Sequence, residues 1–348
     1  MNFAKRWVAA AAVSALGLGA VGSAQAVVSA SDPAFFALPP GALNGAFDGV
    51  AKLLFTNSQG NFVCSGSLLA GGQYVLTAAH CADDFTSMTV DFKLGSVTAN
   101  VTGVTLGTGW AGFNNSVGNG SDIAILKLDK KIVGIDGFKL STTNDVGQFV
   151  LMAGYGLVGT GTTGGTNFDR DPPGTVPRLW RPHVGVNTID TTDFELQESV
   201  FGPGSGNKTY GETYVFDFDD GTAEHNALQR LKDDNAGTWA DSSTGFGDLE
   251  ALIAGGDSGG GDFTFDGTNW LLTGVHSYGW GLCGYLPDCD VLPGTNSSFG
   301  DLSGSTAVFS HAEWINRITA VPEPETYALM LAGLAAIGFA ARRRQAKV

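Results

Sequence analysis

Apolar positions in this sequence come in short runs rather than at helical spacing. Valine, leucine, isoleucine and aromatic residues fill the runs at 74–77, 123–128 and 270–275, and glycine, serine, asparagine or aspartate stands before each. Runs of this length and composition, bounded by turn-forming residues, predict strands. Because no long helical periods alternate with them, the pattern favours antiparallel barrels or sandwiches over a parallel α/β sheet.

One helix is predicted near the end of the chain. Residues 310–313 have the spacing of a capping box, and Trp314, Ile315 and Ile318 then form an apolar stripe. Pro322 ends the segment. The sequence therefore predicts an all-β chain with a C-terminal helix.

The first 26 residues have the features of a secretory signal peptide. A basic start at 5–6 precedes an apolar run over 8–21, and the small residues Ala24 and Ala26 flank a cleavage position. A short run that is charged at its start and followed by a small-x-small site favours a signal peptide over a buried helix. We therefore expect signal peptidase to process the chain during export.

The last residues, 319–348, have the order of a sorting tail. Pro-Glu-Pro at 322–324 precedes an uncharged stretch over 327–341, and three arginines follow at 342–344. This order resembles the PEP-CTERM sorting signal of Gram-negative bacteria. The resemblance implies passage through the inner membrane, transient membrane anchoring by a short transmembrane helix, and processing by an exosortase-type enzyme. The product would be secreted or held at the cell surface or extracellular matrix. An ordinary C-terminal anchor is the alternative.

The chain between these ends, roughly 295 residues, is long enough for two modest domains. The whole sequence carries 19 Lys and Arg against 34 Asp and Glu, a net charge of −15 at pH 7. Such a surface repels polyanions, and no arginine-rich arm offsets it. Nucleic acid is therefore not an expected partner.

Four cysteines in an exported chain indicate disulfides. Cys64 lies near Cys81 in the sequence and Cys283 lies near Cys289, which favours these two pairs among the three connectivities that four cysteines allow. A zinc site is the alternative, but neither pair has short ligand spacing, and His80 alone stands beside one of them. We therefore expect disulfides and no metal at these cysteines.

The stretch 64–81 carries the first candidate catalytic residue. Cys64 precedes an apolar strand that runs into Ala-Ala-His-Cys at 78–81. This arrangement resembles the histidine region of the chymotrypsin and trypsin family of serine proteases. The resemblance implies that His80 is the general base and acid, held by a disulfide between Cys64 and Cys81. It also implies a fold of two antiparallel six-stranded Greek-key barrels.

Two further segments resemble the same family. Asp122 stands before an apolar strand, 42 residues after His80, and Ser258 lies within Gly-Gly-Asp-Ser-Gly-Gly at 255–260. The resemblance implies that Asp122 orients His80, that Ser258 is the nucleophile, and that the N–H groups of Gly256 and Ser258 form the oxyanion hole. The expected activity is acyl-enzyme hydrolysis of peptide bonds in a protein or peptide substrate, without a cofactor.

Substrate contacts are expected on the segment 274–279, which resembles the strand that pairs with an extended substrate. Ser277, Tyr278 and Gly279 lie on it. Leu252 stands six residues before the nucleophile, where trypsin-like members carry an acid at the floor of the specificity pocket. An apolar floor does not offset the desolvation of Lys or Arg, so we expect cleavage after apolar or aromatic residues.

Asp257 matches the acid that pairs with a newly cut N-terminus in this family. After the signal peptide the first Lys or Arg is Lys52, within the predicted strand 50–55, so a tryptic cut would destroy the barrel. We therefore expect no tryptic activation. Either Val27, exposed by signal peptidase, reaches Asp257, or an internal donor satisfies this carboxylate.

The resemblance divides the chain into six segments: the signal peptide 1–26, an N-terminal segment 27–44, the first barrel 45–156 with His80 and Asp122, second-barrel strands with long loop insertions 157–245, the rest of the second barrel with Ser258 and the helix 246–318, and the sorting tail 319–348. Within the inserted region Asp217, Asp219 and Asp220 are a candidate calcium site, with a solvated acidic turn as the alternative.

Two other functions fit parts of the sequence. The glycines at 256 and 260 around Ser258 also satisfy the nucleophile elbow of secreted esterases and lipases. That fold requires the order serine, acid, histidine, whereas here the order is His80, Asp122, Ser258. An inactive barrel that binds a surface is the non-enzymatic alternative, and a covalent serine probe distinguishes it from an enzyme.

Overall fold

The computed structural model describes residues 27–30, 41–171, 174–175, 179–281 and 290–320. The chain divides into two compact units, Met1–Ala312 and Glu313–Val348. Within the described ranges, no helix is long and apolar enough to cross a membrane. The predicted signal peptide and the sorting tail from residue 321 onward lie outside the described residues, so the structure does not test them.

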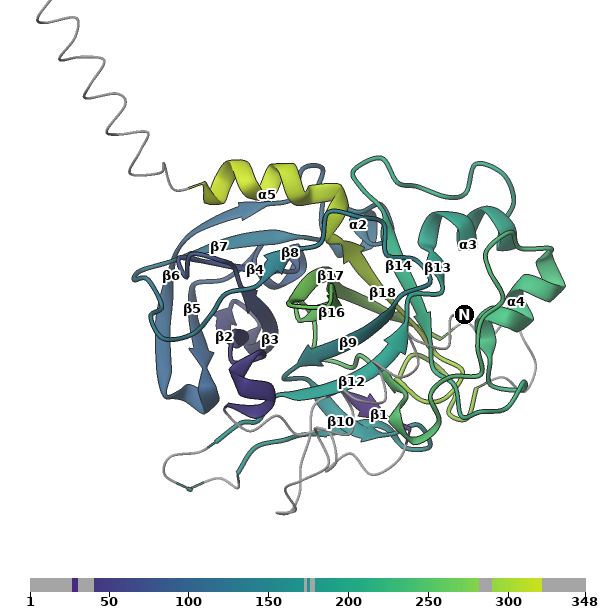
Figure 1. Cartoon of the computed structure of the whole chain (residues 1–348), viewed down its shortest axis with the longest axis horizontal. Coiled ribbons are helices and arrows are strands. Elements are labelled where there is room, and N and C mark those ends of the chain that lie inside the picture. Colours follow the sequence, from purple (N-terminus) through teal and green to yellow (C-terminus); the bar gives the residue numbers. More distant parts are fainter. Residues whose placement is uncertain (1–26, 31–40, 172–173, 176–178, 282–289, 321–348) are drawn as a thin grey trace, which may run out of the picture. The chain divides into compact units, whose positions relative to one another are not determined.

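Six antiparallel strands of the first unit close into a barrel in the order β2-β3-β4-β7-β6-β5, drawn in purple and blue in Figure 1. Their bounds are β2 (Val50–Asn57), β3 (Gly60–Leu68), β4 (Tyr74–Thr77), β5 (Ser87–Phe92), β6 (Val97–Leu106) and β7 (Ala124–Leu128). Side chains alternate between interior and solvent along β5, where Met88, Val90 and Phe92 are buried. The predicted strands at 74–77 and 123–128 are β4 and β7.

The second half of the unit forms an eight-stranded sheet in the order β12-β9-β16-β17-β18-β14-β13, with β8 parallel to β17. Its strands are β8 (Lys139–Leu140), β9 (Phe149–Gly154), β12 (His183–Thr188), β13 (Thr191–Thr192), β14 (Thr213–Asp217), β16 (Gly261–Phe265), β17 (Trp270–Trp280) and β18 (Leu302–Ala307). This sheet is a half-barrel rather than a second closed barrel. Because β8 and β9 already belong to it, the chain leaves the first barrel earlier than the predicted boundary at residue 156.

A small four-stranded sheet completes the β-structure in the order β11-β10-β1-β15. Its strands are β1 (Val28–Ser29), β10 (Leu157–Thr160), β11 (Gly164–Phe168) and β15 (Ala251–Leu252). The strand β1 lies between β10 and β15, so the residues that follow the predicted signal peptide are part of the fold.

Within the ranges that the structure describes, helices are few and short. The α-helices are α2 (Phe113–Ser116), α3 (Asp193–Val200), α4 (Ala227–Asn235) and α5 (Ala312–Thr319), and the 3-10 turns are η2 (Ala42–Gly45), η3 (Ala79–Cys81), η4 (Lys93–Gly95), η5 (Gly247–Leu249) and η7 (Val308–His311). Helix α5 confirms the predicted C-terminal helix. The hydroxyl of Ser310, the first residue of the predicted capping box, accepts a hydrogen bond from the N–H of Glu212 at 3.1 Å. Helices α3 and α4 lie in the inserted region that the sequence predicts as loop.

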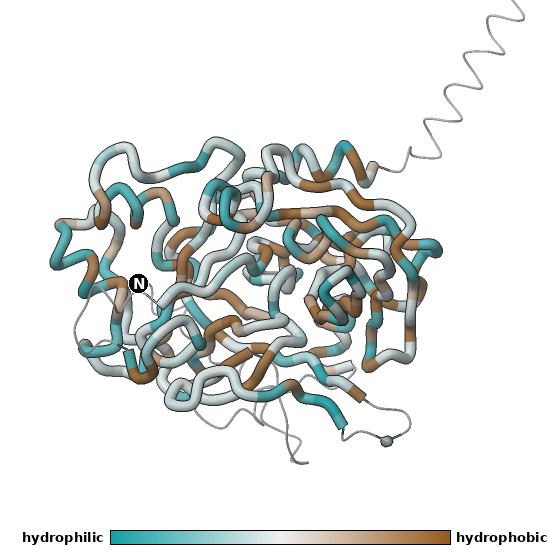
Figure 2. The backbone as a smooth tube through the Cα atoms, turned by 180° about the vertical axis from the view of Figure 1, so that it is seen from behind, coloured by the Kyte–Doolittle hydropathy of each residue, from teal (hydrophilic) through white to brown (hydrophobic). Residues whose placement is uncertain are grey.

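The largest described core of the second half collects residues from distant parts of the sequence. Figure 2 shows hydrophobic stretches on the strands and hydrophilic ones along many of the connecting loops. Val28 of β1, Met152 of β9, Phe216 of β14 and Leu252 of β15 are all fully buried in this core. The core therefore fixes the N-terminal strand and β15, which leads into the loop of Ser258.

Candidate active site

His80 lies on the turn η3, directly after β4, and faces Asp122 at the start of β7. The main-chain N–H of His80 donates to Oδ1 of Asp122 at 3.0 Å, and ring Nδ1 lies 2.8 Å from Oδ2. Asp122 is buried and its Oδ2 also accepts from the Ser277 hydroxyl at 2.5 Å. Hydrogen bonds from His80 on η3 and from Ser277 on β17 thus fix the orientation of this carboxylate.

This arrangement fixes the tautomer of His80. A carboxylate only accepts hydrogen bonds, so the ring proton of a neutral imidazole lies on Nδ1 and the lone pair lies on Nε2. The side chain of His80 is 19% exposed, whereas that of Asp122 is 1% exposed. An imidazole held in this way offers Nε2 as a base, because Nδ1 is occupied by Asp122.

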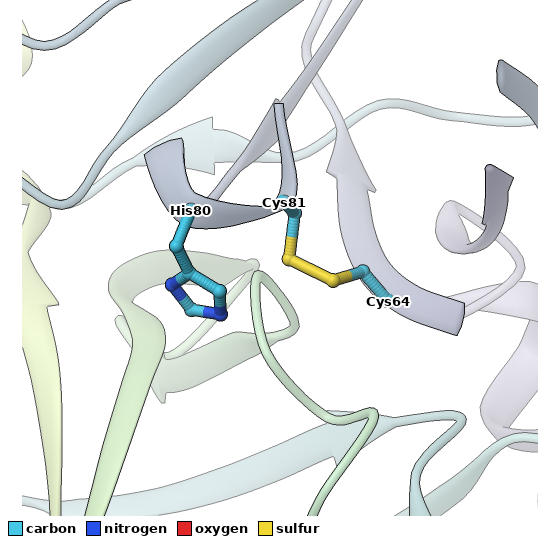
Figure 3. Close-up of side chains that lie close together, drawn as sticks. All are labelled: Cys64, His80 and Cys81. Carbon is cyan, nitrogen blue, oxygen red and sulfur yellow. A yellow bond between two sulfur atoms is a disulfide. The ribbon is translucent and has the colours of Figure 1, made fainter. Parts of the chain in front are cut away.

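The predicted disulfide between Cys64 and Cys81 is present and joins β3 to η3. Figure 3 shows both cysteines and His80 close together. The three side chains are near enough to hold a metal ion, but the two sulfur atoms are bonded to each other, so they are not available as thiolate ligands. In the chain-entropy estimate such a loop closure stabilises by about 3 kcal/mol. The pair Cys283 and Cys289 lies outside the described residues.

Ser258 lies on the loop between β15 and β16, which packs directly on the turn that carries His80. Gly259 has a φ of 79°, and a Cβ there would lie 2.0 Å from Oγ1 of Thr77. Only glycine allows this approach. The carbonyl oxygen of Ser258 lies 3.6 Å from Sγ of Cys81, the residue after His80. The nucleophile candidate and the base candidate are therefore neighbours in space.

Ser65 ties this loop to the first barrel. Its main-chain N–H donates to the carbonyl of Ser258 at 2.8 Å, and its hydroxyl donates to the carbonyl of Gly256 at 3.0 Å. The same hydroxyl accepts from the N–H of Tyr155 at 2.9 Å. One side chain thus connects the loop, β3 and the end of β9.

The candidate reactive atoms are the hydroxyl oxygen of Ser258 and Nε2 of His80. Within the described part of the chain, neither the hydroxyl of Ser258 nor Nε2 of His80 makes a hydrogen bond to another residue. Hydrogen bonds between nucleophile and base are often long before substrate binds. The resting geometry therefore leaves both atoms free to meet a substrate.

Asp257, next to the candidate nucleophile Ser258, is fully buried. Its Oδ1 accepts from the N–H of Gly156 and its Oδ2 from the N–H of Ala254, both at 2.8 Å, and the N–H of Val27 also donates to it. Burial raises the pKa of Asp257 to about 6, against the effects of these donors and of His276. Internal N–H groups and the main-chain N–H of Val27 in the uncut chain therefore reach this carboxylate.

The predicted substrate residues fall into different environments. Ser277 is buried and bonds to Asp122, Gly279 is exposed, and Tyr278 is partly exposed with its hydroxyl donating to Asp193 at 2.5 Å. Leu252 is fully buried in the core of the second half. The strand β17 thus presents Tyr278 and Gly279 to the outside, whereas Leu252 lies in the core.

The predicted calcium ligands separate into two groups. Asp217 and Asp219 are each 1% exposed and lie with the buried Asp190 and Glu250, whereas Asp220 is partly exposed and pairs with a histidine. Burial raises the pKa of Asp217 to about 6, and burial together with the neighbouring carboxylates raises that of Asp219 to about 11. Calcium at Asp217, Asp219 and Asp220 stays a prediction.

This acidic cluster predicts that the protein loses stability as the pH rises from about 4 to 8 in calcium-free buffer. A carboxyl whose pKa is raised by folding stabilises fully below its unfolded value, and this contribution is lost as the pH rises through the folded value. The folded values of about 6 for Asp217 and about 11 for Asp219 place the loss across this range and beyond it. The melting temperature, measured by circular dichroism in EDTA, checks this.

Adding calcium at pH 8 provides the second arm of that experiment. A bound cation would neutralise the carboxylates, raise the melting temperature and flatten its dependence on pH. A melting temperature that rises with pH in EDTA would contradict the linkage. One that does not respond to calcium would contradict the calcium hypothesis.

Sequence reasoning gave no role to three residues that contact the site. Ser65 and His276 lie inside the stretches that carry the family resemblance, and Phe113 of α2 packs edge-on against the ring of His80 with centroids 5.1 Å apart. A histidine in the middle of the mostly apolar strand 270–280 is the available signal for His276. Phe113 is 42% exposed beside the base, where no sequence pattern marks it.

Comparison with known proteins agrees with this geometry. Residues 43–170 match the Trypsin family model, which includes His80 and Asp122 but ends before Ser258, and residues 320–344 match the PEP-CTERM protein-sorting motif. HL collagenase is 18% identical, with 82% of this chain and 97% of that protein covered and a TM-score of 0.51. Neuropsin, a serine protease of mouse brain, is 18% identical, with 79% and 96% covered and a TM-score of 0.50. No curated protein matches the sequence.

The chain therefore has the fold of the chymotrypsin-like serine proteases. It carries a trypsin-family domain and a PEP-CTERM sorting motif. The predicted fold class is confirmed, with the second barrel present as a half-barrel. A protease domain implies protein substrates, and the sorting motif implies exosortase-type processing and suggests export to the surface of a Gram-negative cell.

Proposed function

We propose that this protein is an exported serine endopeptidase that hydrolyses peptide bonds through an acyl-enzyme. Ser258 is the nucleophile, His80 is the general base and acid, and Asp122 orients His80. The observation that carries the proposal is the bond between Nδ1 of His80 and the buried carboxylate of Asp122, on a turn that contacts the loop of Ser258.

In this mechanism Nε2 of His80 takes the hydroxyl proton of Ser258 while the serine oxygen bonds to the substrate carbonyl carbon. The N–H groups of Gly256 and Ser258 stabilise the resulting oxyanion. The imidazolium, stabilised by Asp122, then gives the proton to the leaving amine as the peptide bond breaks. A water molecule repeats the sequence on the acyl-enzyme and releases the acid.

A fluorophosphonate probe with mass spectrometry tests the proposal. We expect one covalent adduct, on Ser258, and cleavage of denatured protein by the same preparation. Absence of the adduct favours the inactive binding barrel. An adduct with hydrolysis of simple esters but no peptide cleavage favours the esterase alternative.

The apolar residue Leu252 leads us to predict cleavage after apolar or aromatic side chains, about tenfold or more faster than after Lys or Arg. Leu252 is fully buried and offers no charge to a cationic side chain, while Gly279 places no side chain on the exposed part of β17. Digestion of a peptide library, with the new termini sequenced by mass spectrometry, measures the preference. A strong preference for Lys or Arg would refute the prediction.

Export and maturation belong to the same proposal. Signal peptidase would cut after Ala26, and an exosortase-type enzyme would process the tail at 319–348 after transient anchoring in the inner membrane. The matched sorting motif supports this route. The intact mass of protein secreted from a host with and without its exosortase tests it, since an unchanged C-terminus in both hosts would contradict processing.

A further inference from the structure

Strand β17 carries a fully buried histidine directly beneath the nucleophile loop. Nδ1 of His276 lies 3.2 Å from the carbonyl oxygen of Asp257, and Nε2 lies 2.9 Å from Oδ1 of Asp262, which is also fully buried. The main chain of His276 pairs with the same loop, accepting from Gly259 at 2.8 Å and donating to Gly260 at 2.9 Å. The imidazole is therefore held on two sides.

Both ring nitrogens of His276 face acceptors. A carbonyl oxygen has no proton to give, and neither has a carboxylate, so both hydrogen bonds form only when the ring carries a proton on each nitrogen. Burial by itself would lower the pKa of His276, but the charge and hydrogen bond of Asp262, with a contribution from Asp257, outweigh it and raise that pKa. The two contacts therefore fit a doubly protonated ring that forms an ion pair with Asp262.

The carbonyl that His276 contacts belongs to the peptide unit that supplies one N–H of the proposed oxyanion hole. The carbonyl of Asp257 and the N–H of Ser258 are parts of one planar trans peptide, so they point in opposite directions. The same carbonyl also accepts from the N–H of Gly260 at 2.7 Å. Two donors on the carbonyl fix the plane, and a charged donor increases the polarity of the N–H at its other end.

We propose that His276 is a positioning residue for the oxyanion hole, in which a buried imidazolium holds the carbonyl of Asp257 and so aims and polarises the N–H of Ser258. This inference rests on the proposed function, because only an acyl-transfer site needs that N–H. A contribution to folding stability does not by itself explain the buried pair of His276 and Asp262. A buried ion pair is often no more stabilising than apolar residues of similar size, and Gly260 already satisfies the carbonyl.

The variant that tests the inference replaces His276→Val together with Asp262→Val, so that no charge is left buried without a partner. Loss of one oxyanion donor costs about 10²–10³ in kcat, and a donor that is only misaimed should cost less, so we expect kcat to fall about ten- to hundredfold. KM should change less than about twofold, because the bond strengthens mainly in the transition state. The melting temperature should not fall.

Two single variants complete the design. His276→Asn keeps a donor near the position of Nδ1, so it should recover most of the lost kcat. His225→Asn, which removes the imidazole of a different histidine–aspartate pair, should leave kcat unchanged. Counting active sites with a fluorophosphonate probe gives kcat per competent molecule. A normal kcat per titrated site in the double variant would show a purely structural role and overturn the inference.

Nuclear magnetic resonance gives a readout that needs no activity. At pH 8 both ring nitrogens of His276 should show the ¹⁵N shifts of a protonated imidazole, and the amide proton of Ser258 should move upfield in the double variant. A single protonated nitrogen, or an unmoved Ser258 amide, overturns the inference. If the parent chain neither binds the probe nor cleaves peptides, the proposed function fails and these shifts still decide the placement of His276.

Discussion

Replacing Ser258→Ala is expected to reduce kcat by about 10⁶ while leaving KM nearly unchanged. A serine, histidine and aspartate that act as one unit lose almost the whole rate when the nucleophile is removed, and the rest comes from binding and the oxyanion hole. His80→Ala should cost about as much, and the double variant should be no slower than either single variant, because each change already breaks the unit. Initial rates on a peptide substrate measure all three.

Ser87→Ala is the matched control, since Ser87 is an exposed serine on β5 of the first barrel. It should keep the parent rate and the probe adduct, whereas Ser258→Ala should lose both. Activity of the Ser258→Ala variant near that of the parent would show that another residue carries the chemistry.

The first barrel and the histidine turn could be predicted from the sequence because their determinants are local. Strands β4 and β7 are short apolar runs between turn formers, and the disulfide of Cys64 and Cys81 follows from residues in one stretch. The orientation of His80 by Asp122 needs only the order of motifs and a resemblance to a known family. These features can be predicted without knowing which distant residues are in contact.

The second half was less accessible to sequence reasoning because its contacts are long-range. The buried pair of His276 and Asp262 depends on the pairing of β16 with β17, which no local pattern specifies. The acidic cluster brings Asp217 close to Glu250. Helix α4 lies between these residues in the sequence, and the sequence does not distinguish it from loop. Burial of a charged residue is decided by such pairings, so neither group could be located from composition or spacing.

The surroundings of Val27 favour a mature chain that begins at this residue. The residue is buried, its N–H reaches Asp257, and the next residues form β1 between β10 and β15. Its φ of 74° lies in the left-handed region, which is strained for a β-branched residue. A cut after Ala26 removes the peptide that defines this φ and so removes the strain.

Cleavage also completes the charge balance around the nucleophile loop. Asp257 and Asp262 carry two negative charges and protonated His276 carries one positive charge, so one unit of buried negative charge is left. The N-terminal ammonium of Val27 would neutralise it, as an amide N–H does not. Signal peptidase would then be the activating protease, and no tryptic cut would be needed.

We therefore expect a chain that begins at Val27 to be at least about 10³ times more active than the same chain with one extra N-terminal glycine, because an unsupported loop loses its oxyanion donors. Asp257→Asn should reduce the activity of the Val27 chain to that of the extended chain, and it should change the activity of the extended chain little.

A negative partner raises the pKa of an amine, so the advantage of the Val27 chain should be full at neutral pH and should be lost as the pH rises beyond about 8. Purified chains of both lengths, counted with a fluorophosphonate probe and assayed from pH 6 to about 10, provide the measurement. Equal activity of the two chains would show that His276 and the internal N–H donors suffice for Asp257, and an active enzyme whose N-terminus follows Lys or Arg would show that a tryptic cut activates it.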